Sequence, residues 1–189
     1  MTKADILQRL KDGNQRFIND QNKAELQDSS RRADLTGGQA PFAIVLSCAD
    51  SRVVPEMAFD AGLGELFVVR VAGNVANSSS IASMEYAVAH LGTEVIVVLG
   101  HESCGAVTAA MGGGDNGYNL NHLLSHIAPA IAASGGDASV LEVVKKNAEL
   151  NAEELKTRSG IIGDAVASGK VTIVPAYYNL GSGEVEFLD

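Results

Sequence analysis

The sequence of 189 residues contains no tryptophan and only two cysteines, Cys48 and Cys104. It also lacks clusters of basic residues, since no run of Lys and Arg is longer than the pairs 31–32 and 145–146, and the formal net charge is −9. A nucleic-acid-binding protein normally presents a basic stripe, and an anionic membrane does not attract an acidic chain. The composition therefore argues against nucleic acid and membrane as partners.

Long hydrophobic segments are absent as well. The most apolar run, residues 95–100, is far too short to span a bilayer, and residues 1–17 lack the continuous apolar region of a secretory leader. We therefore expect a cytoplasmic protein. In a reducing compartment the two cysteines stay reduced, which leaves three roles open for them: buried structural residues, a redox pair or metal ligands.

The remaining composition is that of a globular domain. Apolar residues make up 46% of the chain and charged residues 20%, and this length is enough for one hydrophobic core. No internal repeat or linker divides the sequence. We predict a single domain over residues 1–189, with a helical arm at 1–40 and an α/β core at 41–189.

Short, continuous apolar segments predict four strands buried on both faces, at residues 42–47, 66–70, 94–100 and 170–178. Helical patterns occupy residues 3–18 and, roughly, 53–60, 78–90, 104–111, 120–132 and 138–157. This alternation predicts an α/β fold with a mostly parallel central sheet flanked by helices. A turn at 180–183 followed by alternating residues predicts a C-terminal antiparallel edge strand.

Candidate metal ligands lie at the ends of two predicted strands. Cys48 ends the first, and His101 and Cys104 follow the third. Sites in open α/β sheets form at the carboxyl ends of the strands, so the three side chains meet if these strands are neighbours. Two thiolates and one imidazole suit Zn²⁺, and three protein ligands with one open position form the catalytic type of zinc site. Water or Asp50 can take the fourth position.

Each of these signals has a simpler interpretation. A cysteine at the end of a buried strand is most often a core residue, and His-x-x-Cys alone is weak evidence for a metal. Asp50 and Arg52 are expected to pair, and an exposed pair of this kind contributes little to stability. Beside a metal, however, the guanidinium would hold the carboxylate in place.

Other histidines and glycines give weaker signals. His122 and His126 lie four residues apart on a predicted helix, a spacing that can bind metal, but no third ligand or glutamate base accompanies them. We therefore predict a surface or packing role for both. Neither glycine-rich nucleotide-binding motif is present.

Two segments together resemble the paired signature of the β-class carbonic anhydrases: CADSRV (48–53) and GHESCGAV (100–107). The resemblance extends over nearly the whole chain, through the segments 10–17, 70–77, 81–92 and 176–188. It implies a β-carbonic anhydrase-like domain with a catalytic α/β core. It also implies zinc-dependent, reversible hydration of carbon dioxide to bicarbonate and a proton, by attack of zinc-bound hydroxide.

The resemblance assigns roles to residues of this sequence. Cys48, His101 and Cys104 match the zinc ligands. Asp50 and Arg52 match the catalytic pair, and Asp50 is the fourth zinc ligand in a closed state of the site.

Two further residues match positions that contact substrate in this family. They are Gln39 and Gly105, the second through its backbone N–H. The family also forms homodimers or homotetramers, so the resemblance implies that the helix at 3–18 packs on a partner subunit.

Three other functions remain open. The same fold and ligands also serve hydrolases of carbon disulfide or carbonyl sulfide, and nothing in the sequence separates these gases from carbon dioxide. A non-catalytic zinc protein for assembly or sensing is a second alternative, against which the presence of Asp50 and Arg52 argues. A redox switch that joins Cys48 to Cys104 is the third.

Overall fold

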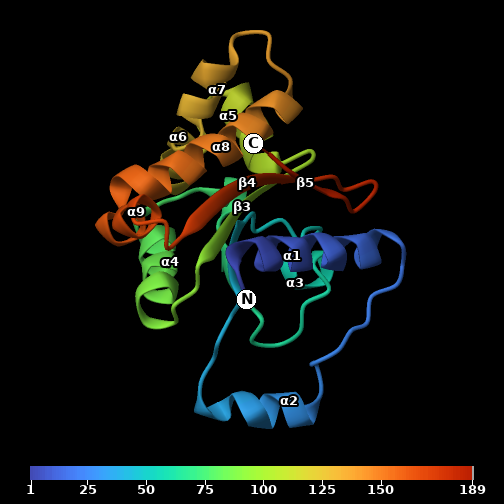
Figure 1. Ribbon diagram of the computed structural model, residues 1–189. Helices are drawn as coiled ribbons and strands as arrows, with labels where there is room; N and C mark the ends of the chain where they lie inside the picture. The colour runs from blue at the N-terminus through green and yellow to red at the C-terminus, as the bar shows by residue number, and fades with distance from the viewer. Residues whose placement is uncertain (189) are drawn as a thin grey trace.

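A five-stranded sheet organises the structure, a computed structural model that describes residues 1–188 (Figure 1). The strand order is β2-β1-β3-β4-β5. Four strands are parallel and β5 is antiparallel to β4. The predicted fold class is thus confirmed, including the antiparallel edge strand. The strands are β1 (Ala43–Ser47), β2 (Leu66–Arg70), β3 (Val95–His101), β4 (Thr172–Tyr178) and β5 (Val185–Phe187).

Helices cover both faces of this sheet. Their bounds are α1 (Lys3–Ile18), α2 (Ser29–Asp34), α3 (Pro55–Ala58), α4 (Ser78–His90), α5 (Gly105–Gly112), α6 (Tyr118–Ser125), α7 (Ala128–Ser134), α8 (Val140–Arg158) and α9 (Gly160–Ala167), with short 3-10 helices at Leu35–Gly37 and Ala72–Asn74. Within the described part of the chain, no helix combines the length and the apolar character needed to cross a membrane.

The continuous apolar sequences of β1 and β3 form the centre of the sheet, and every residue of both strands is buried. Alternate side chains point to opposite faces. Ile44 and Leu46 of β1 face α4, α8 and α9, whereas Ala43 and Val45 face α1 and α3. Figure 1 shows these two groups of helices on opposite sides of the sheet. A third apolar cluster joins α5, α6 and α7 to the first turns of α8 beyond the carboxyl edge of the strands.

Three helices of the structure differ from the prediction. The predicted helix at 53–60 is a single turn, α3. The predicted helix at 120–132 is two helices, α6 and α7, because Pro129 in the first turn of α7 lacks an N–H and disfavours a helical residue before it. Helix α9 was not predicted, since glycines 160 and 163 lower helix propensity.

Packing explains why α9 forms nevertheless. Ser159 caps it by accepting a hydrogen bond from the backbone N–H of Ile162 at 3.0 Å, and Ile162 is fully buried in the core. At Gly163 a Cβ atom would lie 2.5 Å from the carbonyl oxygen of Lys156 in α8. Glycine is therefore required there by the close contact between the two helices.

Helix α1 packs on the sheet of its own chain. Thr2 caps it in a capping box, and the spacing of Ile6 and Leu10 places both in the core cluster with β1 and β3. Helix α1 thus covers part of its own sheet, and the packing of its outer face on a partner subunit stays a prediction. Asn14, one turn further along, is 3% exposed and connects three segments. Its amide donates to the carbonyls of Ala58 and Gly183 and accepts from the N–H of Val185, at 2.8–3.0 Å.

We predict that Asn14→Ala lowers the free energy of unfolding by about 2–4 kcal/mol, because it leaves buried backbone groups without hydrogen-bond partners. Urea unfolding followed by circular dichroism would measure this change. Asn19→Ala is the matched control: Asn19 directly follows the same helix, is exposed, and its side chain donates to the carbonyl oxygen of Gln15. The control should change stability by less than about 0.5 kcal/mol. Equal effects of the two substitutions would contradict a structural role for Asn14.

Candidate metal centre

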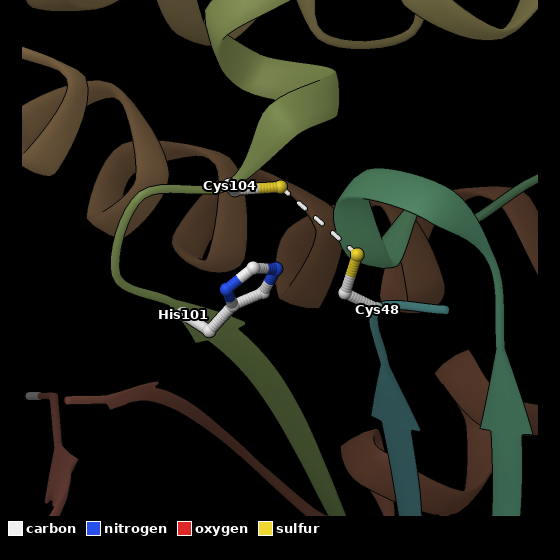
Figure 2. Close-up of side chains that lie close together, drawn as sticks. All are labelled: Cys48, His101 and Cys104. Carbon is white, nitrogen blue, oxygen red and sulfur yellow. Dashed lines mark hydrogen bonds between the residues drawn. The ribbon is translucent and has the colours of Figure 1, made fainter. Parts of the chain in front are cut away.

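The pairing of β1 with β3 brings the predicted ligands together. Ser47 lies opposite Leu99, so Cys48 and His101 both lie at the carboxyl edge of the sheet. Cys104 follows three residues later as the residue that precedes α5. Their ligand atoms all lie within 4.8 Å of one another, and the three side chains point toward one another (Figure 2). All three residues are buried, with exposed fractions of 4%, 0% and 1% for Cys48, His101 and Cys104.

The state of the His101 imidazole fits a metal ligand. Its Nδ1 lies 2.8 Å from the carbonyl oxygen of Glu102, so Nδ1 carries the proton and donates it. Its Nε2 is then a lone-pair donor, and this buried atom has no hydrogen-bond partner among residues 1–188. A buried polar atom without a partner is costly, and coordination of a cation would satisfy it.

The two sulfur atoms fit the same ion. Cys48 Sγ and Cys104 Sγ are 4.0 Å apart, and both cysteines are free thiols. Zn–S bonds of about 2.3 Å in a tetrahedral site would separate two sulfur atoms by about 3.8 Å. The separation of the two sulfur atoms therefore fits a tetrahedral site for a borderline-soft cation.

Hydrogen bonds prepare Cys48 for the thiolate form. The Cys104 thiol, followed by the backbone N–H groups of Asp50 and Gly73, holds the pKa of Cys48 well below its usual range, despite burial. The neighbouring Cys48 sulfur and burial raise the pKa of the Cys104 thiol. Two adjacent thiolates repel each other, and a divalent cation between them removes this repulsion.

A carboxylate lies beside the cluster. Asp50 Oδ2 is 3.8 Å from His101 Nε2. Arg52 donates to both carboxylate oxygens, from Nε to Oδ1 at 2.9 Å and from Nη2 to Oδ2 at 2.7 Å. These bonds hold the pKa of Asp50 well below its usual range, although partial burial opposes them. The carboxylate is thus ionised and fixed at the edge of the three ligand atoms.

Two residues that the sequence analysis did not assign to the site hold its backbone. Arg70, at the end of β2, donates to the carbonyl oxygens of Cys48, Asp50 and Val53 at 2.6–2.9 Å. Glu102 accepts hydrogen bonds from the N–H groups of Leu180 and Gly181, at 2.9 and 3.3 Å, and its own carbonyl accepts from His101. The sequence carries a signal for Arg70, because an arginine ends a strand at the sheet edge that carries Cys48. It carries no signal for Glu102, whose partner Leu180 lies 78 residues away.

The two predicted substrate-contacting residues lie at different ends of the sheet. Gly105 directly follows Cys104 and begins α5, and a Cβ atom there would meet nothing within 4 Å. Gln39 is exposed and precedes β1, whereas Cys48 follows it. A strand of five residues spans about 16 Å, so Gln39 does not join the cluster of its own chain.

A parallel α/β sheet with a buried Cys-His-Cys cluster and an ionised carboxylate at its carboxyl edge defines a metalloenzyme type of site. Comparison with known proteins agrees. The family model described as carbonic anhydrase matches residues 43–185. Carbonic anhydrase 2 of Mycobacterium tuberculosis is 38% identical over 186 residues, which cover 95% of this chain and 90% of that protein. A carbonic anhydrase of Mycolicibacterium smegmatis is 40% identical over 183 residues, covering 94% and 89%.

Solved structures show the same similarity. The β-carbonic anhydrase of Coccomyxa, in complex with acetazolamide, is 30% identical with a TM-score of 0.76 and covers 85% of this chain and 78% of its own. One of two tetrameric β-carbonic anhydrases of Sordaria macrospora is 26% identical with a TM-score of 0.74, covering 83% and 85%. The chain belongs to the carbonic anhydrase family, in its β class.

The geometry predicts one divalent metal ion per chain. Cys104→Ser and His101→Ala each remove one of three ligands, and each should lower the metal retained after dialysis to below about a fifth of that in the wild type. Metal analysis by plasma emission would measure this, with His122→Ala as a control that keeps full occupancy. The wild-type thiols should react with a disulfide reagent only after a chelator is added. A metal-free wild type that forms a Cys48–Cys104 disulfide in air would contradict the prediction.

Proposed function

We propose that this chain is a zinc-dependent carbonic anhydrase that catalyses the reversible hydration of carbon dioxide to bicarbonate and a proton. The observation that carries the proposal is the buried Cys48–His101–Cys104 cluster with an ionised carboxylate 3.8 Å from the free imidazole nitrogen. Membership of the family and the names of relatives at 38–40% identity support it.

In this proposal Cys48 Sγ, His101 Nε2 and Cys104 Sγ hold the zinc ion. When bound, zinc supplies Lewis acidity that lowers the pKa of a coordinated water. In a closed state Asp50 takes the fourth position, which its place beside His101 Nε2 supports. Burial of all three ligands excludes bulk water from their side of the ion.

Asp50 acts as a hydrogen-bond acceptor for the attacking oxygen. An ionised carboxylate offers only lone pairs, so it binds the O–H and leaves a lone pair of that oxygen directed at the carbon of carbon dioxide. Arg52 keeps Asp50 ionised and in a single orientation through two hydrogen bonds. Arg70 fixes the backbone of the same turn, so the carboxylate keeps its place relative to Cys48.

Substrate contacts complete the proposal. The backbone N–H of Gly105 begins α5 beside Cys104 and can donate to a bicarbonate oxygen. Gln39 lies at the far end of β1, so it would reach a site only as Gln39 of the partner subunit. We therefore propose a homodimer or a homotetramer of such dimers, located in the cytoplasm. Apolar surface near one edge of the sheet supports an oligomer. Strand β2 is only partly buried at that edge, and the exposed large hydrophobic residues include Met57, Leu63 and Tyr86.

The first test uses Asp50→Asn, which removes the negative charge and keeps the shape. We expect the variant to retain one zinc per chain and to lose at least about 100-fold in carbon dioxide hydration, because an amide N–H can donate where a lone pair is needed. Stopped-flow measurement with a pH indicator gives the rate. Asp12→Asn, on the exposed face of α1, is the control and should keep wild-type activity.

The proposed reaction would be refuted if the wild type bound one zinc per chain and yet did not hydrate carbon dioxide between pH 7 and 9. Assays with carbon disulfide and carbonyl sulfide on the same preparation would then separate a hydrolase of these gases from a non-catalytic zinc protein.

A second test addresses Gln39 by complementation. Gln39→Ala and Cys48→Ser should each be nearly inactive alone. If Gln39 acts across the dimer, coexpression of the two gives mixed dimers with one complete site, and about a quarter of all sites recover. Hydration activity per total chain, relative to the wild type, measures this. No recovery, or full activity of Gln39→Ala alone, would refute a role for Gln39 across the subunit interface.

A further inference from the structure

A pocket that shares no residue with the metal cluster lies where α4 begins and where α6 and α8 end. Its volume is about 390 Å³, within the range of about 300–1,000 Å³ that small-molecule sites occupy. It is lined by Asn77, Ser78, Ser79, His122, His126 and Arg158. Every one of these side chains can donate a hydrogen bond, and none of them is acidic.

Three basic side chains meet in this pocket, in a chain whose net charge is −9. The imidazole rings of His122 and His126 lie edge to face with centroids 5.3 Å apart. Burial, followed by the positive charges of His122 and Arg158, lowers the pKa of His126, while Glu154 opposes this. The basic groups are thus close enough to repel one another, and an anion among them would relieve the repulsion.

Arg158 lines the pocket and has hydrogen-bond donors that are not used within the chain. Its Nη1 donates to the carbonyl oxygen of Ala76 at 2.6 Å and to Glu154 Oε2 at 2.7 Å. Its Nε and Nη2 make no hydrogen bond within residues 1–188. Because a guanidinium presents its donors in a planar fork, the remaining pair suits an oxyanion.

Backbone N–H groups at the start of α4 already donate hydrogen bonds within the chain. Asn77 Oδ1 accepts from the N–H groups of Ser79 and Ser80 at 3.1 and 3.0 Å. The donors of the pocket are therefore side chains, including the exposed hydroxyls of Ser78 and Ser79.

We propose that this pocket binds a small oxyanion of the phosphate class, either the free ion or a phosphate monoester, with Arg158, His122 and His126 as its cationic ligands. The hydroxyls of Ser78 and Ser79 complete the donor set. The volume of the pocket leaves room for the organic group of an ester.

The surrounding charges make the binding depend on pH. Glu154 and Arg158 come from α8, His122 and His126 from α6, and the first turn of α4 carries no acidic residue. With both imidazoles neutral, Glu154 cancels the charge of Arg158 and the pocket is neutral. With both protonated, it carries two net positive charges. Phosphate therefore binds more tightly as the pH falls through the lowered pKa of His126, and by linkage phosphate raises that pKa.

A metal ion at the same histidines is not supported. Among residues 1–188, the one group of three ligand atoms with metal-site spacing is Cys48, His101 and Cys104. His122 and His126 have no third ligand of this kind, whereas they share their pocket with a guanidinium that a cation would avoid.

The test follows the imidazole ¹H–¹⁵N signals of the zinc-loaded, full-length protein during titration with inorganic phosphate at pH 6 and pH 8. We expect saturable shifts of His122 and His126 at pH 6, weaker binding at pH 8, and no shift of His90. The signal of His101 reports separately on any phosphate at the metal centre. Titration with glycerol 3-phosphate distinguishes a monoester site from a site for the free ion, since the preferred ligand saturates at the lower concentration.

Three variants make the test specific, each checked for an unchanged unfolding temperature. His126→Gln should weaken phosphate binding about fivefold, and Glu154→Gln should strengthen it about fivefold, because one removes a cation and the other removes the opposing anion. His90→Gln is the control and should leave the affinity unchanged. Absence of saturable shifts at His122 and His126 with both phosphate compounds, equal shifts with the same concentration of chloride, or no tightening in Glu154→Gln would overturn the proposal.

Discussion

The parallel pairing of β1 with β3 is the constraint on which the rest of this structure depends. It places the residue after one strand beside the last residue of the next, so ligands 53 to 56 residues apart in sequence become neighbours. Both strands are buried on both faces, and a shift of one residue would turn their core side chains to the wrong side. The register that packs the core therefore also fixes the spacing of the two sulfur atoms and the imidazole.

Charge at the site is controlled by residues with separate tasks. Arg52 binds the side chain of Asp50, while Arg70 binds only backbone oxygens of the same turn. Glu102 carries a negative charge next to His101, yet it directs its carboxylate away, into backbone N–H groups of the β4–β5 turn. The imidazole thus donates from Nδ1 to a carbonyl oxygen, which fixes the ring orientation and leaves the Nε2 lone pair for a metal.

Sequence patterns predicted the sheet because its strands are apolar runs of the length that buried strands have. They predicted the cluster because Cys48, His101 and Cys104 end or follow neighbouring strands. Helix α9 was not predicted because its two glycines lower the helix propensity of the segment. It is stabilised by burial of Ile162 and by contact with α8, and both form only in the folded chain. The packing of α1 and the hydrogen-bond partners of Glu102 depend on contacts between distant segments, which no local pattern encodes.

The hydrogen bonds between Glu102 and the β4–β5 turn also impose an order on biosynthesis. A chain leaving the ribosome presents all three ligands before the segment around Leu180, which follows Glu102 by 78 residues, has been made. Until that turn forms, the carbonyl that orients the imidazole has no anchor on the hairpin. This anchor of the metal centre is therefore complete only when the β4–β5 turn has been synthesised and has paired with Glu102.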